Sequence, residues 1–163
     1  MIDFSDLSRE ERALYNPAFT GLVVSRAVQG HQSEYEQPCP FTVALLSAVM
    51  ALQPSVRQAL PRTTNSGVVR WLEANKGVKA SMTQNAASLA DFVRPGLLLA
   101  LQGGALRCDD QGRLQVSEGR LRKVISGRTE EIVDIQKASH RLGRWLPSAG
   151  SLSIAMTLLG VRP

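Results

Sequence analysis

Residues 105–116 read ALRCDDQGRLQV, two short runs of alternating apolar and polar residues on either side of a turn. The alternation predicts a β-hairpin in which Leu106 and Cys108 pair with Leu114 and Val116. The turn formers DDQG connect the two strands. Because side chains along a strand point to alternate faces, these four residues are expected to share one buried face.

The sequence before the hairpin predicts helices. Asn16 and Pro17 favour a helix start, because asparagine caps a helix and proline at its first position loses no intrahelical hydrogen bond. The polar segment 30–40, GHQSEYEQPCP, is rich in turn formers and predicts a loop. Residues 41–52, FTVALLSAVMAL, are apolar nearly all round and predict a central buried helix.

The segment between residues 61 and 102 predicts three helices in succession. The first is short and amphipathic, and it stops at Gly77. The second ends at Pro95, because proline cannot continue the hydrogen-bond ladder, and the third begins there with the apolar sequence GLLLALQ. Two helices that meet at Pro95 resemble a helix-turn-helix, and a hairpin behind them resembles a wing. The cap candidates of the first helix are Thr64, Asn65 and Ser66.

The last long helix is expected between about residues 129 and 146. Glu130 and Glu131 lie in its first turn, where the helix dipole favours negative charge. At about 100° per residue, its sequence separates into an apolar and a basic side. The basic side carries Lys137, Arg141 and Arg144. The apolar side, expected to face the core, carries Ile132, Ile135, Ala138, Ser139, Leu142, Trp145 and Leu146.

The predicted fold is mostly α with a small β-hairpin wing, a winged-helix-like helical domain. A chain of 163 residues suits one domain. That domain is expected to span residues 1–163. It would contain a helical core at about 14–104, the wing hairpin at about 105–116 and a C-terminal helical extension at about 129–160.

The amino-acid composition and the apolar runs indicate a class of protein and its expected location. With 44% hydrophobic and 20% charged residues, the chain has the composition of a soluble globular protein. The longest apolar run, 41–52, is shorter than the roughly 20 residues that span a bilayer, and the first residues, MIDFSDLSREER, lack a signal-peptide pattern. Cys39 and Cys108 are the only cysteines and form no CxxC motif. The expected location is therefore the reducing cytoplasm, away from the membrane.

The sequence contains no recognisable catalytic or cofactor-binding pattern. GxxxxGK[ST], GxGxxG and the zinc-ligand spacings are all missing, and the two histidines, His31 and His140, lack an activating context. A non-enzymatic protein without a cofactor is therefore expected. Four residues of the polar segment could in principle ligate a metal, but their spacing matches no known framework, and a solvated loop is the favoured interpretation. They are His31, Glu34, Glu36 and Cys39.

Basic residues gather in and after the hairpin. The net charge of +5 and the pI of about 9.8 permit attraction to nucleic acid or to an acidic protein surface. The sequence RLRKVISGR at 120–128 and the basic side of the last helix could neutralise several phosphates, although a solvated surface explains them equally well. The candidate contacts to a nucleic-acid backbone are Arg113, Arg120, Arg122, Lys123, Arg128, Lys137 and Arg141.

The helix before the hairpin, PGLLLALQGG, offers almost no polar side chain that could read a base edge. The hairpin is therefore expected to belong to a module whose apolar helices pack on protein. Any contact with DNA is expected to be limited to the phosphate backbone.

Five segments together carry a resemblance to one family. They are LYNPAFTGLVV (14–24), FTVALL (41–46), RQALPRTTNSGVVRWLEAN (57–75), LLLALQGGALRCDDQGRL (97–114) and HRLGRWLPSAGSLSIAMTLLGVRP (140–163). These segments resemble the middle component of bacterial ABC three-component systems, the group that includes Lamassu-like anti-phage modules. The resemblance implies a small adaptor that works beside a Rad50- or SMC-like ABC ATPase and an effector, often a nuclease, in the response to foreign DNA. Arg144, Trp145 and Arg162 are the matched positions expected to contact a partner.

Two functions remain open on the sequence. An adaptor subunit of a defence complex predicts a stable assembly with neighbouring gene products. A free-standing winged-helix DNA-binding protein instead predicts salt-dependent binding without any partner, weakened by substitution of Arg120, Arg122 or Lys123.

Overall fold

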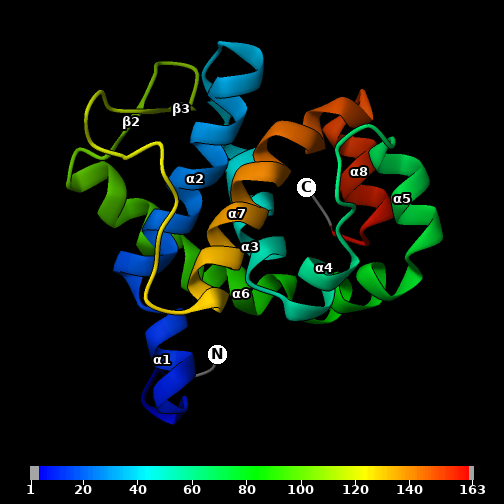
Figure 1. The fold of residues 1–163 in the computed structure, drawn as a ribbon, viewed down its shortest axis with the longest axis horizontal. Coiled ribbons are helices and arrows are strands. Elements are labelled where there is room, and N and C mark those ends of the chain that lie inside the picture. The colour runs from blue at the N-terminus through cyan, green and yellow to red at the C-terminus, as the bar shows by residue number, and fades with distance from the viewer. Residues whose placement is uncertain (1–3, 162–163) are drawn as a thin grey trace.

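A computed structural model describes residues 4–161, and Figure 1 shows the arrangement of their helices and strands. Helix α2 (Pro17–Tyr35) runs through the middle of the protein. It packs against three other helices, α3 (Phe41–Ala51), α6 (Lys76–Gln102) and α7 (Glu130–Trp145). The core therefore forms around α2 as well as around the apolar helix α3 that the sequence marks as central.

Helix α2 begins where the sequence predicts but ends later. The side-chain oxygen of Asn16 accepts a hydrogen bond from the backbone N–H of Phe19 at 2.9 Å, and Pro17 is the first helical residue. The prediction of a loop over 30–40 is wrong for residues 30–35, which continue the helix.

Tertiary contacts keep the polar end of α2 helical. The Gln32 side-chain oxygen accepts a hydrogen bond from the backbone N–H of Val116 at 2.8 Å. The Tyr35 hydroxyl donates to the backbone carbonyl of Arg144 at 2.7 Å. Local sequence contains no signal for these partners, because both lie more than 80 residues away along the chain.

Helices α2 and α7 touch through their backbones. A Cβ atom added at Gly30 would overlap the carbonyl oxygen of His140, and one added at Gly143 would overlap the carbonyl oxygen of Ala27. Each helix therefore supplies a glycine at the point where the other helix comes closest. The crossing leaves no room for a side chain at either position.

Helix α6 is a single helix, and the helix-turn-helix predicted at Pro95 is wrong. Pro95 lies on the exposed side of α6, where water can satisfy the carbonyl that loses its hydrogen bond. The opposite side is held against α2, since a Cβ atom on Gly96 would overlap the backbone of Gly21. The Thr20 hydroxyl also donates to the carbonyl of Phe92 at 3.2 Å. Packing thus overrides the local tendency of proline to end a helix.

The middle of the chain forms shorter helices. After α3 come α4 (Pro54–Ala59) and α5 (Val68–Ala74). The predicted cap is wrong: Gly67, rather than Thr64, Asn65 or Ser66, is the N-cap residue of α5. The helix also ends before the predicted Gly77, which instead lies in the first turn of α6.

The predicted hairpin is present within a three-stranded antiparallel sheet. Strands β2 (Leu106–Cys108) and β3 (Arg113–Val116) pair as predicted, with Leu106 opposite Val116 and Cys108 opposite Leu114. Strand β1 (Cys39–Pro40), from the predicted loop, adds to the free edge of β3.

Only part of the predicted buried face of the hairpin is buried. Leu106 and Leu114 are each 1% exposed, Val116 is half-buried, and Cys108 is exposed. The prediction for Cys108 is wrong: this residue lies at the end of β2, which is an edge strand, whereas its partner Leu114 belongs to the central strand β3. Asp109 instead organises the turn, since its carboxylate accepts hydrogen bonds from the backbone N–H groups of Gln111 and Arg113.

Helix α7 agrees with its prediction. Thr129 caps it, Glu130 and Glu131 lie in its first turn, and it ends at Trp145. Of the residues expected to face inward, all are buried except Ile132, which is half-buried. Residues 117–129 connect β3 to α7 without regular structure and are called the 117–129 segment below.

Short elements complete the two ends of the chain. They are η1 (Phe4–Asp6) and α1 (Arg9–Leu14) at the start, and η2 (Leu146–Ala149) and α8 (Leu152–Leu158) at the end. Helix α1 projects from the body of the molecule, whereas α8 packs beside α5 (Figure 1). The fold is mostly helical with a small antiparallel sheet, as predicted. Within residues 4–161, none of the helices has the length and apolar character that a membrane crossing requires.

Candidate functional site

A hollow of about 410 Å³ lies on the exposed side of α7. Loop residues 62–65 form one wall, and the 117–129 segment reaches it from the other direction with Ile125. Figure 1 shows α7 between these two connections. None of the lining residues is acidic. The α7 hollow is lined by Arg62, Thr63, Thr64, Asn65, Ile125, Lys137, His140, Arg141 and Arg144.

The geometry of α7 brings its basic residues to the hollow. Lys137, Arg141 and Arg144 follow one another at intervals of four and three residues, so they lie along one side of the helix. The opposite side is buried against α2 and α3. The sequence predicted this basic side, but it did not predict that Arg62 would lie beside it.

Three side chains hold the loop that carries Arg62. The indole N–H of Trp71 donates to the carbonyl of Ala59 at 2.7 Å. The Arg141 guanidinium donates to the carbonyl of Pro61 at 2.9 Å, and the indole N–H of Trp145 donates to the carbonyl of Ser66 at 2.8 Å. These bonds fix the loop on both sides of residues 62–65.

Two of the cations in the hollow have protein partners. Arg144 donates through two nitrogens to one carboxylate oxygen of Glu34, at 3.0 and 2.8 Å. Arg141 is tied to the carbonyl of Pro61, which is uncharged. Within the described chain, neither Arg62 nor Lys137 forms an ion pair, and both side chains are exposed. Positive charge therefore remains uncompensated in the hollow.

His140 lies in the hollow without adding to its charge at neutral pH. Burial lowers the pKa of His140 below its usual 6.5, and the positive charges of Arg144 and Arg26 lower it further. The imidazole is therefore neutral at pH 7, and one of its ring nitrogens can donate a hydrogen bond while the other accepts one.

Arg26 is a functional candidate that sequence reasoning missed. It is 4% exposed in the middle of α2, and burial lowers its pKa. Its guanidinium donates to the Gln136 side-chain oxygen at 3.0 Å and to the carbonyl of Arg122 at 2.5 Å. No carboxylate pairs with it among residues 4–161. The signal available in the sequence was a single cation within the apolar stretch LVVSRAV.

Arg26 and Gln136 together attach the 117–129 segment to the helices. The Gln136 side-chain amide donates to the carbonyl of Ser126 at 3.0 Å, while Arg26 binds the carbonyl of Arg122. Both contacts involve backbone atoms of the segment. They therefore fix the course of the segment and leave its basic side chains exposed.

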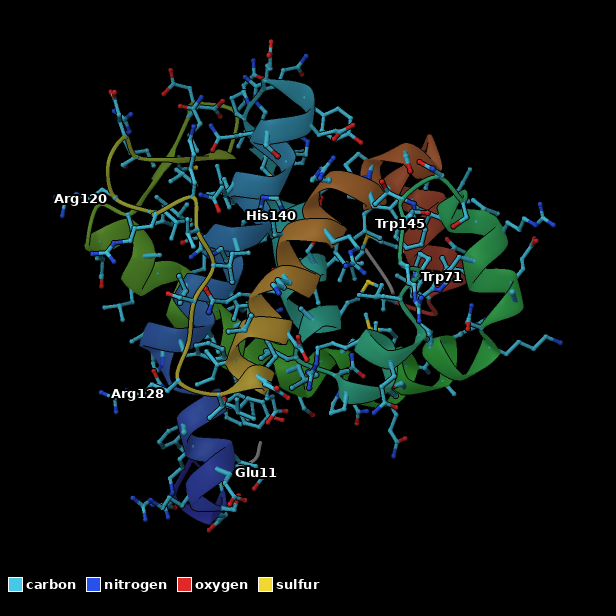
Figure 2. All side chains as sticks on the ribbon, viewed as in Figure 1. Glu11, Trp71, Arg120, Arg128, His140 and Trp145 are labelled. Atoms are coloured by element: carbon cyan, nitrogen blue, oxygen red, sulfur yellow. The ribbon has the colours of Figure 1, made fainter. Side chains whose placement is uncertain are left out.

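The remaining predicted basic residues lie outside the hollow. Arg113 forms an ion pair with Asp109 at 2.8 Å. Arg120 and Arg128 extend from the edge of the molecule, away from α7 (Figure 2). Arg122 and Lys123 are exposed on the 117–129 segment. Of the seven residues predicted to contact a nucleic-acid backbone, the hollow brings together Lys137 and Arg141, and it adds Arg144 and Arg62.

The family model of the ABC-three component (ABC-3C) system Middle Component 3 matches residues 4–163, almost the whole chain. The chain belongs to this family. No curated protein and no solved structure matches it.

The partner-binding prediction for the middle component needs one correction. Trp145 is 1% exposed and packs against Trp71, so it has no surface for a partner in this structure (Figure 2). Its position holds the loop of the α7 hollow instead. Arg144 is accessible, with 43% of its side chain exposed. Arg162 lies outside the described residues.

The polar segment of the middle component is used for structure. His31 is buried, its ring is tilted by 39° against that of Tyr35 at a centroid distance of 4.7 Å, and burial lowers its pKa. Cys39 is buried in the sheet, and burial raises the pKa of its thiol to about 12. Across residues 4–161 there is no group of three or more His, Cys, Asp or Glu side chains placed to hold a metal ion.

The middle component also exposes two neighbouring leucines on α6. Leu98 is 55% exposed and Leu99 is 45% exposed. They belong to the apolar stretch GLLLALQ, which is expected to pack on protein. A surface of this kind is stabilised when another protein covers it, because apolar area is removed from water.

Proposed function

We propose that this middle component is a non-catalytic adaptor of a bacterial anti-phage or anti-plasmid defence complex of the Lamassu-like group. In that complex it links an SMC- or Rad50-like ABC ATPase to an effector such as a nuclease. The observation that carries the proposal is the family match over residues 4–163, since a middle component is named for its place among other components. The adaptor role and the identity of both partners are the proposed part.

Two surfaces support a role in assembly. Leu98 and Leu99 form an exposed apolar pair on α6, which a second subunit would cover. Arg144 presents an accessible guanidinium next to Glu34, and together with Arg162 it is the proposed polar contact. Trp145 acts indirectly in this proposal, because it holds the neighbouring loop.

The test is co-expression of the tagged protein with the neighbouring genes, followed by affinity purification and native mass determination. A large ABC ATPase in the purified complex is the expected result. The double variant Leu98→Glu/Leu99→Glu should lose the complex, because it places two charges where apolar contact is proposed. The matched control is Ala87→Glu/Ser88→Glu, which adds the same charge at two exposed positions of the same helix and should keep the complex.

Elution of the protein alone in the wild-type experiment would overturn the adaptor proposal. Equal loss of the complex in both double variants would instead show that added charge, rather than position, disrupts it, and would remove α6 from the proposed interface.

A further inference from the structure

We infer that the α7 hollow binds the phosphate backbone of nucleic acid. The inference does not rest on the adaptor role, because it concerns the isolated protein, and the tested residues Arg62 and Lys137 are not among the proposed assembly contacts. Arg144 belongs to both surfaces. It assigns to the hollow a ligand class and a set of contact residues, including Arg62, which comes from a distant part of the chain.

The chemistry of the hollow suits a phosphodiester. Phosphate oxygens in protein complexes with nucleic acid are bound by arginine and lysine together with neutral donors such as threonine and asparagine. The hollow contains both kinds, with Arg62, Lys137 and Arg141 beside Thr64 and Asn65. The lining residues include no carboxylate, and Glu34 forms its ion pair with Arg144 rather than with Arg62 or Lys137. If the basic side of α7 were only a solvated surface, no wall with neutral hydrogen-bond donors would face its cations.

The spacing of the cations suits a chain of phosphates better than a single anion. Lys137 and Arg144 are seven residues apart on α7, which corresponds to about 10.5 Å along the helix axis. Successive phosphates of one DNA strand advance by about 3.4 Å along the duplex axis, so a row of cations parallel to that axis extends over roughly three such steps. A free phosphate compound would need a more convergent set of donors.

The hollow is formed before any ligand arrives. Arg141 and Trp145 hold the loop carbonyls of Pro61 and Ser66, so the wall that carries Arg62 does not have to be ordered during binding. Arg141 is itself held in place by the same hydrogen bond. A preformed site avoids part of the entropy cost of association.

The expected binding is independent of base sequence. The cations and the neutral His140 that α7 presents line a hollow. Arginine and lysine read bases only where they enter a groove and match base edges. Contacts to phosphates position a protein on the duplex but carry no sequence information directly.

The experiment measures binding of the full-length protein to a fluorescein-labelled 20-bp duplex by anisotropy, over a series of salt concentrations. The test variant is Arg62→Gln/Lys137→Gln, because both side chains are exposed and neither forms an ion pair within the described residues. The matched control is Arg9→Gln/Lys76→Gln, which removes the same charges at exposed positions of α1 and α6. The net charge is then the same in both variants.

Loss of two phosphate contacts should make the slope of log K against log [salt] less steep by about 1.8. It should weaken binding about 30-fold at 0.15 M salt. The control should retain the wild-type slope. Each single variant, Arg62→Gln or Lys137→Gln, should account for about half of the change in slope. A thermal unfolding curve for every variant shows that it is folded.

Three results would overturn the inference. One is an absence of binding by the wild-type protein at physiological salt. Another is an equal effect of the test and control variants, which would assign the binding to net charge alone. The third is displacement of the duplex by inorganic triphosphate at equal phosphate concentration, which would assign the hollow to a free phosphate compound. None of them bears on the purification experiment that tests the adaptor role.

Discussion

The indole ring of Trp145 stands edge-on to that of Trp71, with the ring centroids 5.2 Å apart and an angle of 65° between the planes. Each ring also donates a hydrogen bond to a backbone carbonyl: Trp71 to Ala59, the last residue of α4, and Trp145 to Ser66 in the connection between α4 and α5. The aromatic pair therefore joins α5, α7 and one wall of the α7 hollow. Stability and the shape of the hollow depend on the same two side chains.

Replacement of Trp145 tests this joint role. Trp145→Ala should lower the free energy of unfolding by about 3 to 5 kcal/mol, since it removes a buried aromatic side chain. Trp145→Phe keeps most of the ring contact but leaves the Ser66 carbonyl without its donor, and it should cost about 1 kcal/mol. Urea denaturation measures both values. Equal stability of wild type and Trp145→Ala would show that the α7 orientation described here is incorrect.

Arg26 should control the protease sensitivity of the 117–129 segment. Arg26→Ala leaves the carbonyl of Arg122 and the side chain of Gln136 without a charged donor. It should lower the free energy of unfolding by about 2 to 3 kcal/mol. The segment itself carries exposed sites for trypsin, so its cleavage rate reports on its attachment. In Arg26→Ala, trypsin should cleave the segment faster than in the wild-type protein, and mass spectrometry identifies the cleavage sites. The expected sites follow Arg120, Arg122, Lys123 and Arg128. Arg26→Lys keeps the positive charge but loses the planar set of guanidinium N–H donors, so an intermediate cleavage rate is expected.

The crossing of α2 and α7 predicts opposite outcomes for two glycine substitutions. Gly143→Ala should destabilise the protein by about 1 to 3 kcal/mol, because the new Cβ atom overlaps the carbonyl of Ala27. Gly77→Ala is the control in α6, where no atom lies within 4 Å of the added Cβ atom. It should gain roughly 0.5 to 1 kcal/mol from helix propensity. Thermal unfolding compares the two, and a neutral Gly143→Ala would contradict the close approach.

Acidification should destabilise the protein before its carboxylates titrate. Burial lowers the pKa of both His31 and His140 in the folded state. Near pH 6.5 the unfolded chain therefore takes up protons that the folded protein does not, and linkage requires the free energy of unfolding to decrease as pH falls. Denaturant titrations between pH 7.5 and 5.5 measure this decrease. The His140→Gln variant should show a shallower pH dependence, and a slope as steep as wild type would argue against burial of that histidine.

The sequence predicts best those features that depend on local pattern. The cap at Asn16, the start of α7 near residue 129, the two sides of α7 and the pairing of Leu106 with Val116 all follow from spacing or turn chemistry. The helix end predicted at Pro95 is wrong because helix packing outweighs the local effect of proline. The end of α2 does not follow from local sequence because its hydrogen-bond partners are distant along the chain.

The candidate site was predictable only in part, for the same reason. Lys137, Arg141 and Arg144 share one helix, so their common side follows from periodicity. Arg62 reaches them through hydrogen bonds that α7 side chains make to backbone carbonyls of its loop, and such bonds leave no trace in composition or spacing. The same holds for Arg26, whose partner carbonyl belongs to a residue 96 positions away.

Gly30 and Gly143 have a consequence for the evolution of the surface. Their backbone contacts fix the rotation of α7 about its own axis. Moving the contact point by one residue would require α7 to rotate by about 100°. Mutations can therefore change which charges α7 displays, but they cannot turn a different side of the helix outward. In related chains, a substitution at an outward position leaves the helix crossing intact, whereas the two glycines should stay as they are.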